Sequence, residues 1–189
     1  MAERLERLTP DDLTPEQAQV YEAIAGGPRA SGPQLFELKD SNGALNGPFG
    51  IMLHQPGIGL ALQGVGVAVR YHTTLTDRCR EIAILQVGVA EQSPFEWYAH
   101  EAIGRAVGLS EAELEALSKG EFHSDDSLEE SVARFTDRVL SDEHLSEDEY
   151  QKFEASLGAT QMVEIITLVG YYRTLASLMR VFEVGVPNG

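Results

Sequence analysis

Glu81, Glu96 and His100 are the residues whose types and spacing favour proton-transfer chemistry. Glu96 and His100 are four residues apart, so on a helix they lie on the same face. Glu81 begins the apolar run EIAIL, and a short turn after this run would fold it against the helix that contains His100. An imidazole has an ordinary pKa of about 6.5 and therefore donates or accepts a proton near neutral pH. The spacing predicts a dry pocket in which two carboxylates and one imidazole handle protons.

Each of these residues also has a structural interpretation. Ser93 and Glu96 have the S-x-x-E spacing of a capping box, so Glu96 either bonds back to the start of its helix or lines the pocket. In the pocket, the helix dipole would lower the pKa of Glu96 and favour a role as a base or charge partner. Glu81 is either a buried carboxylate held by an N–H group or an arginine, or a functional group whose pKa burial raises towards neutrality. His100 by itself is compatible with a hydrogen-bonded core histidine.

Three segments around these residues resemble the carboxymuconolactone decarboxylase and alkylhydroperoxidase D superfamily, a group of small all-helical oligomeric proteins. LTDRCREIAIL resembles the helix before the family's site, FEWYAHEAIGRAVGLS resembles the site helix, and NGPFGIMLHQPGIG resembles the segment that approaches the pocket. Together they extend from Asn46 to Ser110. The resemblance implies an alkylhydroperoxidase D-like helical bundle that assembles as a homo-oligomer, either a trimer or a hexamer.

One difference separates this chain from the peroxidase branch, in which a glutamate is followed by a C-x-x-C pair and then by a histidine. Matching Glu81 and His100 to that pattern puts Ser93 and Glu96 where the two cysteines would stand. A dithiol peroxidase needs one thiolate to attack peroxide and a second thiol to form the disulfide, whereas the only cysteine here, Cys79, lies outside the motif. The residues therefore resemble the decarboxylase branch.

That branch implies a cofactor-independent lyase of aromatic-compound degradation, acting on a small carboxylated lactone similar to 4-carboxymuconolactone or on a related cyclic acid. The conjugated carbonyl of such a substrate accepts the electrons that the departing carbon dioxide leaves behind. His100 is the predicted proton donor, with Glu81 orienting it and Glu96 positioning water or substrate. Trp97 is predicted to line the substrate pocket, although a core position is the alternative. His54 lies in the segment MLHQPG that would approach the site, and a structural histidine is the alternative.

A metal centre and a bound cofactor are not expected. Glu96 and His100 could share one ion with His54 or Glu81, but no spacing fixes a third ligand, and the resemblance implies no metal. An anionic substrate does need local positive charge in so acidic a chain. The candidate sources, which the sequence does not assign to the site, are Arg70, Arg80 and Arg173.

Two other function classes remain open. A non-enzymatic helical protein for ligand binding or assembly would keep the fold without the reaction. A one-cysteine peroxidase would require a reactive, low-pKa thiol at Cys79.

Length and charge limit the organisation and the partners. The 189 residues, 43% of them hydrophobic, predict one domain over 1–189 with an N-terminal helix and loop extension over about 1–48. The formal net charge of -16 would repel nucleic acid and anionic membrane surfaces, so we expect neither as a partner. The single cysteine and the charged start MAERLERLTP predict a cytoplasmic protein without disulfides. Neither apolar segment, 58–69 or 163–182, is predicted to span a membrane, since the first is too short and the second contains charged residues.

Signals for the starts and ends of helices predict an all-α fold. Capping-box spacing occurs at Thr14 and Gln17, Ser93 and Glu96, Ser110 and Glu113, and Ser146 and Glu149. We expect helices near 15–25, 57–72, 77–91, 94–107, 111–119, 127–141, 147–157 and 159–184. Residues 26–50 are predicted to form a long loop that acts as a lid or pocket wall. The last helix is apolar around much of its circumference, which predicts burial in the core or between subunits.

Overall fold

A computed structural model describes residues 4–27, 30–31, 35–141 and 143–187 of the chain. Within these residues the fold is helical, with no strand beyond an isolated antiparallel bridge between Lys39 and Leu45. The elements are η1 (Pro10–Asp12), α1 (Pro15–Ala25), α2 (Pro48–Met52), α3 (Pro56–Tyr71), α4 (Asp77–Ala90), α5 (Pro94–Ala106), α6 (Glu111–Lys119), α7 (Ser127–Leu140) and α8 (Glu147–Phe182). The predicted all-α class is confirmed.

The predicted helices are present, and one short helix is added. The helices expected at 147–157 and 159–184 lie end to end within α8, and they are separated at Gly158, which adopts the non-helical angles φ 70° and ψ 162°. The short helix α2 lies at the end of the segment predicted as a loop, because Pro48 follows a glycine and supplies the φ angle that a first helical turn requires. Complete capping boxes form at Thr14, Ser110 and Ser146, as predicted.

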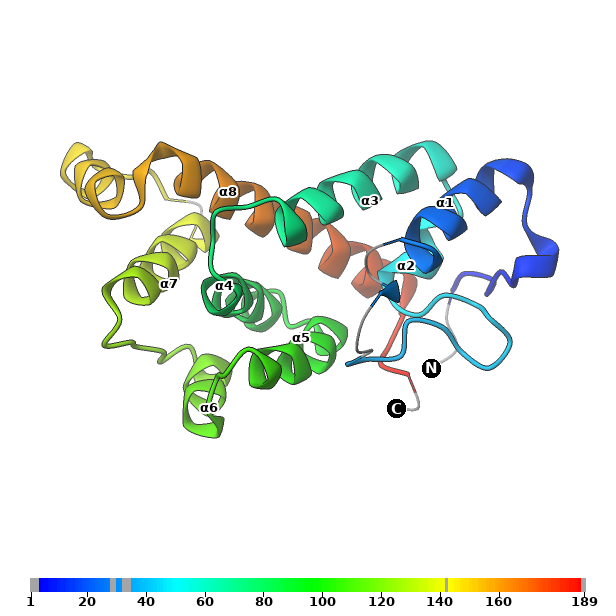
Figure 1. Cartoon of the computed structure of the whole chain (residues 1–189), viewed down its shortest axis with the longest axis horizontal. Helices are drawn as coiled ribbons and strands as arrows, with labels where there is room; N and C mark the ends of the chain where they lie inside the picture. Colours follow the sequence, from blue (N-terminus) through cyan, green and yellow to red (C-terminus); the bar gives the residue numbers. More distant parts are fainter. Residues whose placement is uncertain (1–3, 28–29, 32–34, 142, 188–189) are drawn as a thin grey trace.

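Helix α4 lies at the centre of the molecule and contacts α5, α6, α7 and α8 (Figure 1). Its apolar side chains contribute to two hydrophobic clusters: Ala83, Ile84 and Val87 to the main core, and Ile82 and Leu85 to a smaller one beside α6. A helix surrounded by other helices is apolar on all faces, which explains the continuous apolar run that follows Glu81. A charged residue at that position is therefore placed in the interior of the protein.

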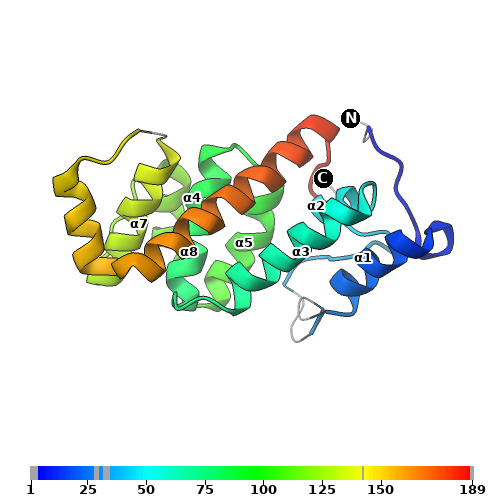
Figure 2. The ribbon, with the colours of Figure 1, turned by 90° about the horizontal axis from the view of Figure 1, so that it is seen from above.

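Helix α8 runs along the length of the molecule, and α1, α2 and α3 pack together at one end (Figure 2). The start of the described chain lies along the end of α8, where the Arg4 N–H donates to the Phe182 carbonyl at 3.0 Å. None of the helices in the described ranges combines the length and apolar character needed to cross a membrane.

Gly47 permits a close approach between the segment before α2 and the start of α5. It adopts φ 60° and ψ -141°, a conformation that L side chains rarely adopt, and a Cβ atom there would overlap the ring of Phe95. The tight turn brings Phe49 of α2 against the core, where it is 4% exposed. Residue 47, near the end of the segment predicted as a pocket wall, is thereby held close to α5; residues 28–29 and 32–34 of that segment lie outside the described part of the chain.

Arg78 of α4 links three helices. Its Nε donates to Glu129 of α7 at 2.6 Å, its Nη2 donates to Glu113 of α6 at 2.7 Å, and its Nη1 donates to the Gly108 carbonyl. Glu129 is only 9% exposed, so loss of Arg78 would leave a mostly buried carboxylate without its cation. We expect Arg78→Ala to lower the free energy of unfolding, measured by urea titration, by about 2 kcal/mol. This loss is smaller than the full cost of breaking a buried ion pair, because Arg78 is partly exposed.

The matched control is Arg105→Ala, which removes a solvent-exposed arginine bonded to Glu101 and Glu111. Exposed ion pairs contribute little, so this variant should unfold close to the native midpoint. Equal destabilisation by both substitutions would contradict a special role for the Arg78 network.

Candidate active site

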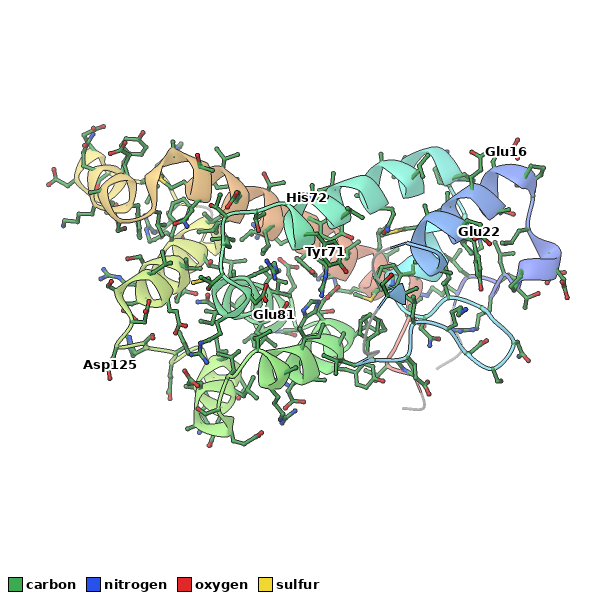
Figure 3. The ribbon with its side chains drawn as sticks, viewed as in Figure 1. Glu16, Glu22, Tyr71, His72, Glu81 and Asp125 are labelled. Carbon is green, nitrogen blue, oxygen red and sulfur yellow. The ribbon has the colours of Figure 1, made fainter. Side chains whose placement is uncertain are left out.

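The side chains of Glu81, Glu96 and His100 meet between α4 and α5. His100 Nδ1 lies 2.6 Å from Glu81 Oε2, and His100 Nε2 lies 3.6 Å from Glu96 Oε2. All three residues are buried, with exposed fractions of 1%, 3% and 4% respectively. Figure 3 shows Glu81 on α4 near the middle of the molecule, below the end of α3 that carries Tyr71 and His72. The tertiary structure thus brings together the cluster that the spacing predicts.

The turn between α4 and α5 sets this geometry. Gln92 adopts φ 51°, which reverses the chain within a few residues. Gly88 faces the start of α5, where a Cβ atom on it would meet Glu96 Cβ at 3.4 Å, an ordinary contact distance. The reversal therefore places the first turns of α5 directly against the last turns of α4.

Glu96 lines a cavity instead of completing a capping box. Ser93 Oγ accepts a bond from the Glu96 N–H at 3.5 Å, but the Ser93 N–H donates to the Gly88 carbonyl at 2.9 Å. The serine therefore caps α5, while the Glu96 carboxylate lies beside His100. Of the two interpretations of the S-x-x-E spacing, the geometry favours the pocket role for the carboxylate.

The cavity next to these groups is small and mainly aromatic. Its volume, measured as the space open to the centre of a water-sized molecule, is about 10 Å³, enough for a single water. Its lining residues come from α2, α3, α5, α8 and the segment before α2: Phe36, Pro48, Phe49, Arg70, Phe95, Glu96, Ala99, His100, Tyr171, Tyr172 and Leu175. Glu81 is not among them, because it lies behind His100. A bound molecule would touch His100 and Glu96, and Glu81 would act through the imidazole.

Phe36 separates this cavity from a larger surface hollow. Its ring stacks on Phe49 with centroids 6.4 Å apart and meets Phe95 edge-on at 6.3 Å. The outer hollow has a volume of about 630 Å³, and Phe36 and Tyr98 are among the residues that line it. Phe36 is thus a lining residue that the two spaces share.

The charge environment keeps Glu81 ionised. Burial tends to raise its pKa, but the neighbouring His100, together with Arg70 and Arg80, holds the pKa of Glu81 below its ordinary value. The prediction of a pKa raised towards neutrality is therefore wrong, since it considered burial without the cations that the fold places nearby. A carboxylate can only accept a hydrogen bond, so Nδ1 of His100 is the donor to Glu81 and Nε2 is the nitrogen beside Glu96.

Two residues predicted to contact substrate lie elsewhere. Trp97 packs against the smaller hydrophobic cluster and does not line the cavity. His54 is exposed, and its Nε2 lies 3.0 Å from the Glu6 carbonyl. The structure does not bring either side chain to the cluster: Trp97 follows Glu96 on a different face of α5, and His54, two residues after α2, is exposed to solvent.

Among the cavity residues that the sequence did not assign to the site, three are polar: Arg70, Tyr171 and Tyr172. Arg70 is one of three arginines named as possible sources of positive charge, and only the fold distinguishes them. Arg80 pairs with Asp77, and Arg173 pairs with Glu91 at 2.8 Å. Among the residues that the structure describes, no group of three or more His, Cys, Asp or Glu side chains is arranged to hold a metal ion.

Comparison with known proteins identifies the fold. No protein-family profile and no curated protein sequence matches the chain. Among solved structures, an uncharacterised peroxidase-related protein from Ralstonia eutropha JMP134, with an alkylhydroperoxidase AhpD core, superimposes with a TM-score of 0.76 over 98% of this chain and 93% of its own, at 14% identity. This chain has an alkylhydroperoxidase D-like fold.

A second structure with this fold is a variant of the debrominase Bmp8 in complex with 2,3,4-tribromopyrrole. It superimposes with a TM-score of 0.73 over 100% of this chain and 94% of its own, at 13% identity. At this level of identity the likeness shows the fold alone. The chemistry must therefore be argued from the side chains of this chain.

Proposed function

We propose that this protein is a cofactor-independent lyase that removes carbon dioxide from a small carboxylated lactone or a related cyclic acid. The observation that supports this most directly is the buried row of Glu81, His100 and Glu96, with distances of 2.6 Å and 3.6 Å between successive partners. Such a row holds an imidazole in one orientation and lets it deliver a proton into a dry cavity. The likeness in fold to a superfamily that includes decarboxylase-like members is consistent with this proposal.

The reaction would proceed in two steps. The bond between the ring carbon and the carboxylate breaks, carbon dioxide leaves, and the electron pair moves into the conjugated carbonyl to give a dienolate. His100 Nε2 then protonates carbon and collapses the dienolate, while ionised Glu81 stabilises the imidazolium before transfer. Glu96 would position the substrate or the water that returns a proton to His100. Aromatic walls formed by Phe49 and Phe95 would exclude bulk water from the departing carboxylate.

The test is release of carbon dioxide from a panel of carboxylated unsaturated lactones and β-keto acids by the native protein. Turnover of at least one lactone acid, lost in His100→Ala, is expected. Absence of release from the whole panel would contradict the proposal and favour another lactone reaction or a non-enzymatic binding role.

A peroxidase function has weaker support in this chain. The only cysteine, Cys79, is 1% exposed in the main core, and burial raises the pKa of its thiol. The thiolate, which attacks peroxide, is therefore disfavoured. We expect native Cys79 to react slowly with a thiol-labelling reagent and to react fully only after unfolding in urea. Rapid native labelling, together with peroxide consumption that Cys79→Ser abolishes, would favour the one-cysteine peroxidase.

We also propose that the protein is a homo-oligomer that associates through α3 and α8. The two helices lie along the same face of the molecule (Figure 2), and both expose apolar side chains. Large exposed apolar side chains on these two helices include Ile58, Leu60 and Val65 of α3 and Val163, Ile166 and Val181 of α8. On α8, the exposed residues Val163, Ile166, Gly170 and Thr174 recur every three or four positions and form a continuous stripe.

Light scattering should therefore give a mass of three or six times 20.7 kDa. Ile166→Glu should shift the mass towards the monomer, because it buries a charge at the proposed contact. Lys152→Glu, a substitution on the same helix outside the stripe, should leave the mass unchanged. A monomeric native protein would contradict the proposal.

A further inference from the structure

We propose that the cleft between α7 and the first part of α8 is a binding site for an α-amino acid with an apolar side chain. The cleft has a volume of about 530 Å³, which is in the range of small-molecule sites. It shares no lining residue with the cavity beside His100. The two segments that form it lie at the end of the molecule opposite α1 (Figure 1). The site is therefore separate from the proposed lyase chemistry.

Two facing helix surfaces form the walls of this cleft. The lining positions 130, 134, 137 and 138 share one face of α7, and the positions 149, 152, 153 and 156 share one face of α8. All four positions on α8 precede Gly158, where the helix is kinked, and Figure 2 shows this first part of α8 at an angle to the rest. Phe153 gives the cleft an apolar surface on which the side chain of an amino acid can pack.

The charged side chains that line the cleft balance each other. There are three of each sign: Glu130, Asp137, Glu149, Arg134, Arg138 and Lys152. This balance disfavours a simple ion as the ligand, because the carboxylates repel an anion and the basic groups repel a metal cation. A ligand that carries both signs meets neither repulsion. An amino acid near neutral pH is such a zwitterion.

Half of these charges are used within the protein. Arg138 pairs with Glu143 at 2.9 Å and with Glu149 at 3.2 Å. Glu149 also completes the capping box at the start of α8. Glu130 accepts a hydrogen bond from the Ser124 N–H at 3.1 Å. These three side chains are therefore fixed parts of the wall, and the groups left to bind a ligand lie between them.

Arg134 and Lys152 supply the positive charge from opposite walls. Other basic residues of this acidic chain pair with carboxylates, as Arg78, Arg105 and Lys119 do. Among the described residues, neither Arg134 nor Lys152 has an ion-pair or hydrogen-bond partner. A ligand carboxylate between the two walls would accept charge-assisted hydrogen bonds from the guanidinium on one side and from the ammonium group on the other.

Asp137 supplies the negative charge. Gln86 of α4 donates to Asp137 Oδ1 at 2.7 Å and holds the carboxylate in place. Burial, and to a smaller degree Glu130, raises the pKa of Asp137 above its ordinary value, so a cation beside this carboxylate would be stabilising. Arg134 precedes Asp137 by three positions, and such side chains are neighbours on a helix, with Cβ atoms about 5–6 Å apart. That spacing suits the carboxylate and ammonium groups of one α-amino acid, which are attached to the same carbon.

Titration calorimetry with leucine and two of its derivatives tests the site. N-acetylleucine lacks the positive charge, and leucinamide lacks the negative charge. We expect the protein to bind leucine at least about tenfold more tightly than either derivative, because each derivative loses one charge-assisted contact. Valine, methionine and phenylalanine, each with the same two derivatives, complete the panel.

Substitutions in the cleft assign the two charges. Arg134→Gln should lower the affinity for leucine to that for leucinamide, and Lys152→Gln should act in the same direction. Asp137→Asn should lower the affinity for leucine to that for N-acetylleucine. Arg134 and Lys152 are exposed, so their variants should fold. Arg105→Gln, which removes an exposed and paired arginine on α5, is the control and should leave every affinity unchanged.

Three outcomes would overturn the proposal. The first is that no amino acid of the panel binds, and the second is that the derivatives bind as tightly as the amino acids. The third is a preference for the zwitterion that persists in both Arg134→Gln and Asp137→Asn, because the ligand would then lie elsewhere. If Asp137→Asn folds poorly through its altered bond to Gln86, the exposed substitution Arg134→Gln decides alone.

Discussion

Replacing His100 with alanine is expected to lower kcat for carbon dioxide release by about 10²–10⁴-fold, the usual contribution of a positioned general acid. His100 is the only histidine that lines the cavity among the described residues, and Glu81 fixes the orientation of its ring. Without it, solvent would have to protonate the dienolate at a buried position lined by aromatic side chains. The measurement is single-turnover release of carbon dioxide from the best substrate of the panel.

Controls must separate chemistry from folding, because alanine also leaves Glu81 buried without its partner. His100→Asn keeps a polar side chain that can donate to Glu81, so it should fold better than His100→Ala and remain inactive. His123→Ala removes a histidine whose side chain is 84% exposed, and it should turn over like the native protein. Substantial release by a folded His100→Asn would show that the imidazole is not the proton donor.

Replacing Glu81 with glutamine is expected to reduce both turnover and stability. The neutral amide cannot stabilise the imidazolium, so kcat should fall by about 10²-fold, the lower end of the range for acid–base catalysis. At pH 7 the free energy of unfolding should fall by about 2 kcal/mol, since a buried hydrogen-bonded ion is replaced by a neutral group of the same size. Urea titrations and the carbon dioxide assay measure the two effects on the same variant. Glu101→Gln, at an exposed pair on α5, is the matched control and should change neither quantity.

The stability effect of Glu81→Gln should depend on pH in a defined direction. The fold lowers the pKa of Glu81 below its ordinary value of 4.5, so near that pH the unfolded chain binds more protons than the folded protein. The ionised carboxylate therefore stabilises the fold above pH 4.5, and this contribution is lost as the pH falls through the lower value of the folded state. The difference between native protein and variant should be largest near neutral pH and narrow in acid. A difference that disappears already between pH 7 and pH 6 would indicate a raised pKa instead.

The sequence by itself determined the helical framework. Local signals were sufficient because a helix start depends on neighbours within one turn, as the capping boxes at Ser110 and Ser146 show. The spacing between Glu81 and His100 also predicted that their side chains meet, because two helices joined by one short turn can pack against each other in only a few ways. The break before residue 159 was visible as Gly158, which needs a positive φ.

Only the tertiary structure decided what surrounds the cluster. The S-x-x-E spacing predicts a cap equally well at three helices, and only the fold shows that the Glu96 carboxylate lies beside His100 instead of completing the cap. Arg70 and Tyr172 are 102 positions apart, and no local pattern connects them.

The same limit explains the wrong pKa prediction for Glu81 and the placement of His54 and Trp97 away from the cavity. An apolar run in the sequence predicts burial, but the pKa of a buried carboxylate also depends on the cations that the fold places near it. The direction in which a side chain points depends on which face of its helix the other helices cover. Helix formation is local in sequence, whereas electrostatics and pocket walls depend on contacts between distant segments.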